Sequence, residues 1–186
     1  MCIRDRDRIE AIREETETAV REGSTTLILS DKNISNQKAS IPSILTVGAV
    51  HSHLVKHGLR GYCSLNVECS DALDTHSFAV LIGVGATTIN PYLAIDSIYQ
   101  RFEKKLFGKS DFESCVVKFK KAIDAGLLKI ISKMGISVIS SYRGGCNFEA
   151  VGLSRAIVSD YFSGMSSRIS GTVSYTHLRA HETRIH

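Results

Sequence analysis

Between residues 126 and 155 the chain reads GLLKIISKMGISVISSYRGGCNFEAVGLSR. The pattern predicts the end of a helix, a stop at Gly135, a short buried strand over 136–141, a glycine-rich turn and then a new helix. The strand is predicted because its β-branched run is typical of the buried strands of parallel sheets. The polar residues that follow come where an α/β sheet presents the carboxyl ends of its strands, which is the usual side for ligands.

The rest of the chain alternates between the same two kinds of element. Strands separated by helices indicate βαβ units. We therefore expect one α/β domain with a mainly parallel sheet and flanking helices. Besides 136–141, strands are predicted at 26–29, 62–69 and 87–89, and helices at 7–21, 44–56, 74–82, 91–107, 111–134 and 154–162.

The two ends of the chain are predicted not to belong to this fold. Residues 1–6 and 172–177 can be encoded by DNA strings that are reverse complements of each other across a shared core. Natural coding ends have no reason to be inverted repeats, and the repeat resembles a sequencing adapter translated with its insert. We expect residues 1–6 and 172–186 to be adapter-derived and 7–171 to be native. The alternative is a genuine basic, histidine-rich tail that binds metal or nucleic acid.

Composition excludes several classes of protein. The formal charge of +4 falls to +2 when the four arginines and two acidic residues of these ends are set aside, so no signal for nucleic-acid binding remains. About 165 residues are left, enough for one domain. No stretch approaches the roughly 20 apolar residues of a membrane span, and no signal peptide is visible. The scattered spacing of Cys63, Cys69, Cys115 and Cys146 fits a reducing cytoplasm.

His51, His53 and His57 make the sharpest metal-like pattern. His53 and His57 are four residues apart and therefore share a helical face, as zinc ligands can. The residues between them lack the acidic general base of a zinc protease. Two interpretations stay open: a metal-binding hydrolase module that uses all three histidines, or imidazoles near the negative end of a helix.

Several segments of the chain together resemble one known family. They are LILSD at 27–31, GAVH at 48–51, DTHSFAVLIGVGAT at 74–87, NPYLA at 90–94 and GMSSRISG at 164–171. These segments and the stretch 126–155 resemble, in order, the central domain of glutamate synthase large subunits of the bacterial NADPH-dependent type. The resemblance runs from about residue 20 to residue 171.

The resemblance implies a place in a multidomain oxidoreductase of ammonia assimilation. In that family an amidotransferase domain hydrolyses glutamine, and ammonia travels through a tunnel to an FMN domain. There it reacts with 2-oxoglutarate, so that glutamine, 2-oxoglutarate and NADPH yield two glutamates. Electrons come from a separate small NADPH-oxidising subunit through iron–sulfur clusters. The central domain connects the two active sites, helps wall the tunnel and is an open relative of the β/α-barrel. This chain is then an incomplete piece of that domain, with no catalytic, cofactor-binding or metal residue of its own and no nucleic-acid or membrane partner.

Two local patterns are weighed against this resemblance. Cys63 and Cys69 have the spacing with which the family's iron–sulfur motif opens, but the third position is Asp74, and cluster irons need thiolates. We interpret both as buried cysteines. The glycines of 83–86 follow a predicted helix, whereas a dinucleotide fingerprint follows a strand. We expect them to serve close packing or a tight turn.

Five residues are candidates for an interdomain or tunnel-lining role: Lys133, Ser141, Tyr142, Arg143 and Glu149. Arg143 can pair with Glu149 or with a carboxylate of a neighbouring domain. Local bracing is the other interpretation of these residues. For the chain as a whole, a structural or regulatory module without enzymatic relatives also stays open.

Overall fold

The computed structural model describes residues 2–33, 40–145 and 147–172. The predicted adapter-derived stretch after residue 172 and Cys146 lie outside these residues. The elements in chain order are α1 (Cys2–Arg21), β1 (Thr26–Ser30), α2 (Ser43–Lys56), a 3-10 turn η1 (Arg60–Tyr62), β2 (Ser64–Glu68), α3 (Thr75–Gly83), β3 (Thr88–Asn90), α4 (Tyr92–Glu103), α5 (Phe112–Lys133), α6 (Ile139–Tyr142), β4 (Glu149–Leu153), α7 (Arg155–Tyr161) and β5 (Ser166–Thr172).

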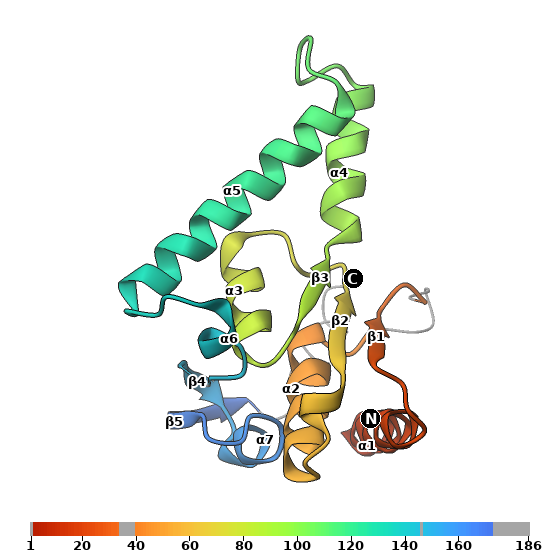
Figure 1. The fold of residues 1–186 in the computed structure, drawn as a ribbon, viewed down its shortest axis with the longest axis vertical. Helices are drawn as coiled ribbons and strands as arrows, with labels where there is room; N and C mark the ends of the chain where they lie inside the picture. Colours follow the sequence, from red (N-terminus) through yellow and green to blue (C-terminus); the bar gives the residue numbers. More distant parts are fainter. Residues whose placement is uncertain (1, 34–39, 146, 173–186) are drawn as a thin grey trace, which may run out of the picture.

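The main sheet is parallel, with strand order β1-β2-β3 and helices α2 and α3 as its crossovers (Figure 1). Leu27 pairs with Leu65 and Val67 with Ile89 in the register. Leu27, Leu65 and Val67 are buried because alternate residues of a strand point to the same face, and this face packs on α2. The predicted α/β fold with a mainly parallel sheet is confirmed.

The other face of this sheet is not covered by the residues that the structure describes. Ile28 lies there with 67% of its surface exposed, beside Asn66 and Thr88 in neighbouring strands. The hydroxyl of Thr88 donates to Asn66 Oδ1 at 2.6 Å. Parallel sheets are normally covered on both faces, so an open face is what an incomplete α/β domain presents.

Helices α4 and α5 leave the body of the molecule and meet at a distant tip (Figure 1). The predicted helix 91–107 ends earlier, at Glu103, because Lys105 takes a positive φ of 56°. Asp111 accepts a hydrogen bond from the N–H of Ser114 and so caps α5. Gly135, with a φ of 70°, ends that helix as predicted.

The predicted buried strand over 136–141 is wrong. Val138 is extended, but Ile139 to Tyr142 form one helical turn, and none of the strands in the described part of the chain pairs with the segment. Val138 and Ile139 are 52% and 46% exposed, and Tyr142 is the residue of this run that reaches the core. A short β-branched run does not distinguish a strand from a helical turn, because only a neighbouring strand can supply the ladder of hydrogen bonds.

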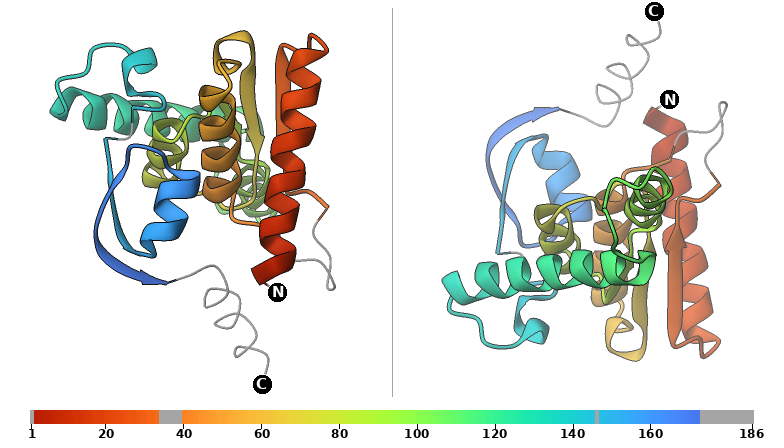
Figure 2. Two further views of the ribbon diagram at one scale, coloured as in Figure 1. Left: turned by 90° about the horizontal axis from the view of Figure 1, so that it is seen from below. Right: turned by 90° about the horizontal axis from the view of Figure 1, so that it is seen from above.

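The chain then forms a second parallel pair that the sequence pattern did not predict. Strands β4 and β5 lie side by side around α7 (Figure 2). Each strand contains a glycine, and β5 has Ile169 as its one apolar residue, which masks the usual strand signal. Helix α7 packs on α2 at Gly48, where a Cβ would overlap the ring of Phe162 and lie 2.9 Å from the carbonyl oxygen of Tyr161.

In the described part of the chain, the structure has no helix long and apolar enough to cross a membrane. Cys63, Cys69 and Cys115 are buried free thiols.

Candidate functional site

Polar side chains join the carboxyl ends of the three strands of the main sheet. Glu68 ends β2 and lies between Ser30 of β1 and Asn90 of β3 in the register. Its carboxylate accepts hydrogen bonds from Ser30 Oγ at 2.7 Å and Asn90 Nδ2 at 3.1 Å, and it pairs with Lys32 Nζ at 2.6 Å. The contact with Lys32, followed by that with Ser30, lowers the pKa of Glu68. Glu68 therefore stays ionised at neutral pH and connects three strand ends.

The loops that follow β1 and β2 add two more carboxylates. Asp31 accepts hydrogen bonds from the backbone N–H and the hydroxyl of Ser70, at 2.9 and 2.7 Å. Asp71 accepts one from the backbone N–H of Ser43 at 3.1 Å and so caps the N-terminus of α2. Burial, followed by the charge of Asp71, raises the pKa of Cys69 to about 12. This thiol stays protonated and is a poor nucleophile.

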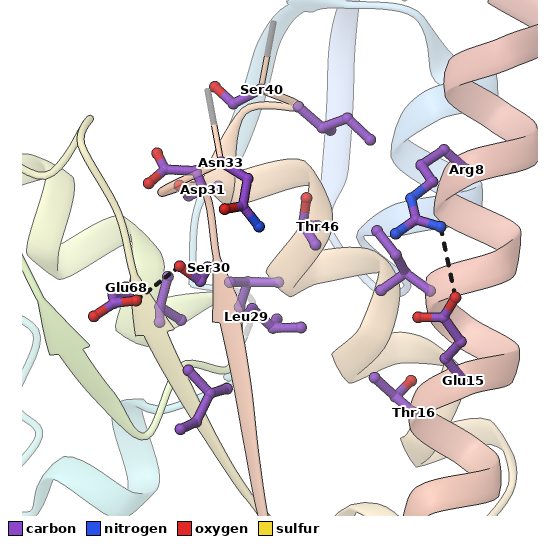
Figure 3. A pocket seen from close by; sticks show the side chains of 16 residues that line it. Arg8, Glu15, Thr16, Leu29, Ser30, Asp31, Asn33, Ser40, Thr46 and Glu68 are labelled. Atoms are coloured by element: carbon purple, nitrogen blue, oxygen red, sulfur yellow. Dashed lines mark hydrogen bonds and ion pairs between the residues drawn. The ribbon is translucent and has the colours of Figure 1, made fainter. Parts of the chain in front are cut away.

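A pocket of about 420 Å³ opens beside these strand ends, between α1, β1 and α2 (Figure 3). Arg8 and Glu15 of α1 form an ion pair of 3.5 Å on its far side. The volume lies within the range of small-molecule sites. Its lining includes the apolar side chains of Leu29, Val47 and Val67 and the polar ones of Ser30, Asp31 and Glu68.

The charges at the strand ends decide what this edge of the sheet can hold. Among the described residues of the strand ends and the loops after them, Asp31, Glu68 and Asp71 contribute three carboxylates and Lys32 one ammonium. An anion is repelled by this excess of negative charge. The N-terminus of α2, which could otherwise bind a phosphate, is already capped by Asp71. The arrangement therefore suits a cation or a neutral hydrogen-bond donor better than the phosphate of a nucleotide or flavin.

At the opposite end of the strands, where β2 and β3 begin, Arg60 connects these two strands to α2. Its guanidinium donates to the carbonyl oxygens of Cys63 at 2.6 Å and Gly85 at 2.8 Å, and to Nδ1 of His51 at 3.1 Å. Burial, followed by the charges of two nearby arginines, lowers the pKa of His51 to about 4. Gly85 has a φ of 125°, and a Cβ there would overlap the His51 ring. The predicted packing role of this glycine segment is confirmed.

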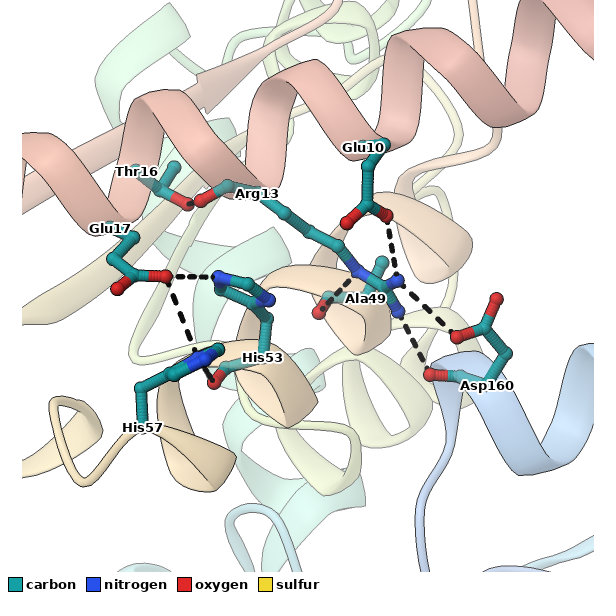
Figure 4. Close-up of polar contacts among 8 residues, drawn as sticks. All are labelled: Glu10, Arg13, Thr16, Glu17, Ala49, His53, His57 and Asp160. Atoms are coloured by element: carbon teal, nitrogen blue, oxygen red, sulfur yellow. Dashed lines mark hydrogen bonds and ion pairs between the residues drawn. The ribbon is translucent and has the colours of Figure 1, made fainter.

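The three histidines at the end of α2 do not form one site. His51 faces Gly85, whereas His53 and His57 face α1 (Figure 4). There Glu17 Oε2 lies 2.6 Å from His53 Nε2 and 3.5 Å from His57 Nδ1. Positions 51 and 53 point in nearly opposite directions because successive helical residues are turned by about 100°. The alternative of one metal centre made of His51, His53 and His57 is therefore not supported, and neither is the hydrolase module based on it.

The interpretation of Cys63 and Cys69 as buried cysteines is confirmed. The two residues flank β2 at its opposite ends and are 8% and 1% exposed. Six steps of about 3.3 Å along a strand put them roughly 20 Å apart. Two thiols at that distance cannot ligate one cluster.

Tyr142, a predicted interdomain candidate, lies in the interior of the described chain. Its side chain is 0% exposed, and its hydroxyl donates to the carbonyl oxygen of Ala79 in α3 at 3.0 Å. Its ring meets the edge of Phe148, with centroids 5.9 Å apart. The residue holds α6 against α3.

The other four predicted candidates, Lys133, Ser141, Arg143 and Glu149, are exposed. Glu149 forms an ion pair of 3.4 Å with Arg168 of β5, instead of the pair with Arg143 that the sequence suggested. Arg143 lies close enough to His51 to contribute to lowering the pKa of that histidine. The interdomain role of these four side chains stays a prediction.

Sequence reasoning missed the residue that joins three helices, Arg13 (Figure 4). Its guanidinium donates to the carbonyl oxygens of Ala49 in α2, at 3.3 Å, and Asp160 in α7, at 2.8 Å. It also pairs with Glu10 at 3.1 Å and lies 5.1 Å from the ring centre of Tyr161. Arg13 is 7% exposed. Arg13 lies in a charged helix, and nothing in its local sequence marks it as buried.

Comparison with known proteins points to one family. The family described as the glutamate synthase central domain matches residues 5–154. The chain is 59% identical, over 166 residues, to the glutamate synthase [NADPH] large chain of Azospirillum brasilense, and this alignment covers 89% of the chain and 11% of that relative. It is 45% identical over 159 residues to the corresponding large chain of Bacillus subtilis, covering 84% of the chain and 10% of the relative.

Similarity extends to glutamate synthases named for another electron donor. The ferredoxin-dependent glutamate synthase of Pyropia yezoensis is 42% identical over 177 residues, which cover 89% of the chain and 12% of that relative. The chain thus spans about a tenth of the length of the curated relatives it matches. These relatives are enzymes, which contradicts the reading as a module without enzymatic relatives.

Proposed function

Because this chain belongs to the glutamate synthase central domain family, we propose that it is a connecting segment of the large subunit of an NADPH-dependent glutamate synthase. In that enzyme it joins the glutamine amidotransferase domain to the FMN domain and helps wall the tunnel that carries ammonia between them. The parent reaction converts glutamine, 2-oxoglutarate and NADPH to two glutamates. The 59% identity over 89% of the chain carries this proposal.

A connecting role is consistent with how the polar groups of the chain are used. Each carboxylate at the strand ends already has a partner within the chain. Glu68 pairs with Lys32, Asp31 accepts hydrogen bonds from Ser70, and Asp71 accepts one from the N-terminus of α2. The most strongly shifted histidine, His51, is held neutral by burial and used as an acceptor for Arg60. A catalytic group needs a lone pair or a proton that is free to reach a substrate. The lone pairs and protons of these groups are used instead in hydrogen bonds that stabilise the fold.

The cofactors of the parent enzyme belong, in this proposal, to the rest of the protein. FMN carries a phosphate, which the negative strand ends disfavour. Cys63 and Cys69 are too far apart along β2 to hold a cluster together. The chain itself therefore binds neither FMN nor an iron–sulfur cluster, and its isolated form is inactive.

The partners in this proposal are the amidotransferase and FMN domains of the same large subunit and a small NADPH-oxidising subunit, in the cytoplasm. Exposed apolar side chains near the four exposed candidates support contact with another domain, because large apolar patches mark interaction surfaces. Val138, Ile139 and Val151 are 52%, 46% and 65% exposed. Residues 1–6 and 172–186 remain adapter-derived in this proposal.

The DNA on either side of this coding segment tests the family role. We expect amidotransferase-coding sequence upstream and FMN-domain sequence downstream, in one reading frame. Unrelated sequence on both sides would refute the connecting role.

The tunnel role is tested in the complete enzyme by charge reversal at Arg143. If this side chain helps seal the contact with a neighbouring domain, R143E releases free ammonia, so that more glutamine is hydrolysed than 2-oxoglutarate is converted. Glutamine hydrolysis and ammonia-dependent glutamate formation, each measured alone, stay unchanged. Lys109, exposed near the tip between α4 and α5, provides the matched reversal K109E, which we expect to keep the two reactions coupled. Full coupling in R143E would exclude Arg143 from the tunnel wall.

A further inference from the structure

We propose that Glu17, His53 and His57 form a binding site for a divalent late-transition-metal ion such as Zn²⁺, which joins α1 to α2. Each of the three residues offers one donor atom, and these atoms lie within 4.8 Å of one another. The imidazole rings of His53 and His57 have centroids 4.3 Å apart. The carboxylate of Glu17 faces both rings from the other helix (Figure 4).

The donor set matches the chemistry of such ions. Two imidazoles and one carboxylate are a known protein ligand set for zinc, which binds nitrogen and oxygen donors at about 2.0–2.2 Å. Imidazole nitrogen also favours Ni²⁺ and Cu²⁺ over Mg²⁺ and Ca²⁺, which prefer oxygen ligands. The site therefore selects late transition metals.

Only a small movement separates the present geometry from a coordination site. Tetrahedral bonds of about 2.1 Å place neighbouring ligand atoms roughly 3.4 Å apart. The contact of 2.6 Å between Glu17 Oε2 and His53 Nε2 must widen by less than an ångström, while that of 3.5 Å to His57 Nδ1 already has this length. The Nδ1 atom of His57 must also give up its hydrogen bond of 2.9 Å with the carbonyl oxygen of His53. The ion takes the place of the hydrogen in the bond between Glu17 Oε2 and His53 Nε2.

The surroundings of the three ligands also suit a bound ion. Arg21 donates to the second carboxylate oxygen of Glu17 at 2.8 Å, an outer-shell contact that orients the ligand. His53 and Glu17 are 14% and 22% exposed, so they are held in place. His57 is 35% exposed and leaves an approach for the ion and for a water as fourth ligand.

Metal binding should stabilise the packing of α1 on α2, because the ligands come together only in the folded chain. An ion present at a hundredfold excess over its dissociation constant raises the thermal midpoint of a chain of this size by about 5–10 °C. No hydrolytic activity follows from this site.

Zinc titration of the full chain, by calorimetry and by thermal unfolding, tests the proposal. His177 and His181 have the same four-residue spacing and are replaced by alanine, together with His186, in every protein used. In this background we expect one equivalent of Zn²⁺ to bind and the thermal midpoint to rise. H57A and E17Q should each weaken binding at least tenfold.

Two comparisons separate a metal site from a simple ion pair. E17Q keeps a hydrogen-bond acceptor for His53 but removes the anionic ligand, so loss of zinc binding in E17Q identifies Glu17 as a ligand. H76A changes an exposed histidine on α3 and should bind zinc as the background protein does. H53A removes the third ligand and should also lose zinc binding. If H53A does not fold, the zinc affinities of H57A and E17Q decide whether the site exists. Absence of binding at 100-fold molar excess of zinc, or binding undiminished in both H57A and E17Q, would overturn the proposal.

Discussion

Replacing Arg13 with methionine tests whether one buried cation holds the first helix on the domain. Methionine keeps most of the apolar length of the side chain but removes every donor. The change deletes the hydrogen bonds to the carbonyl oxygens of Ala49 and Asp160 and the contact with the ring of Tyr161. Hydrogen bonds of a charged group contribute about 1.5–3 kcal/mol each.

The desolvation of a buried guanidinium offsets part of this gain. Arg13 is 7% exposed, and this cost disappears in R13M. We therefore expect R13M to lower the free energy of unfolding by about 2 kcal/mol rather than by the full sum of the lost bonds. R13K, which keeps the charge but not the fork of donors, should lose about 1 kcal/mol.

Urea unfolding followed by far-ultraviolet circular dichroism measures the effect. With a urea dependence of about 2 kcal/mol per molar, R13M moves the midpoint down by roughly 1 M. R8M is the matched control on the same helix, because Arg8 and its partner Glu15 are 61% and 65% exposed. Such a surface pair contributes less than about 0.5 kcal/mol. An R13M midpoint equal to that of the unsubstituted chain, or equal losses in R8M and R13M, would refute the reasoning.

Three further predictions concern single contacts. His51 has a folded pKa of about 4, below the ordinary 6.5, so the unfolded chain binds more protons between these values and stability falls as pH drops from 6.5 to 4. After allowance for the partial exposure of His51, the free energy of unfolding lost over this pH range is about 2 kcal/mol. The urea midpoint should therefore change less with pH in H51N than in the unsubstituted chain, and equal slopes in the two proteins would contradict this. G83A should lower the free energy of unfolding by about 1–2 kcal/mol, although alanine favours helices, because its Cβ would overlap the ring of Phe148. G61A, with open space around its Cβ, is the control. Equal thermal midpoints in G83A and G61A would count against the packing role of Gly83. Y142F should cost about 1 kcal/mol through the lost hydrogen bond to Ala79, measured by urea unfolding, and an unchanged midpoint would show that this bond contributes nothing.

Most element boundaries could be predicted because their signals are local. Asp74 caps α3 through the N–H of Ser77, Ser154 caps α7, and Gly135 ends α5. Each signal depends on a residue and its neighbours within one turn. The predicted strand at 136–141 did not form because pairing is not local. Among the residues that the structure describes, no strand pairs with this segment, and Ile139 to Tyr142 form a helical turn instead.

The candidate sites were predictable only in part. The spacing of His53 and His57 correctly indicated a shared face, but the third member of that cluster, Glu17, lies 36 residues away and carries no motif. His51 was grouped with them by proximity in sequence and was separated by the turn of the helix. Arg13 was hidden for the same reason, since its partner Asp160 lies 147 residues further along the chain.

The sequence by itself determined the family of this chain, its α/β class and most of the ends of its helices. These follow from ordered segments of residues and from contacts that close within a few positions. The tertiary structure alone decided which charged groups are buried, which strands pair and which histidines share a carboxylate. Those outcomes depend on long-range packing, in which a residue's surroundings are set by elements far away in sequence, so its burial cannot be read from its neighbours.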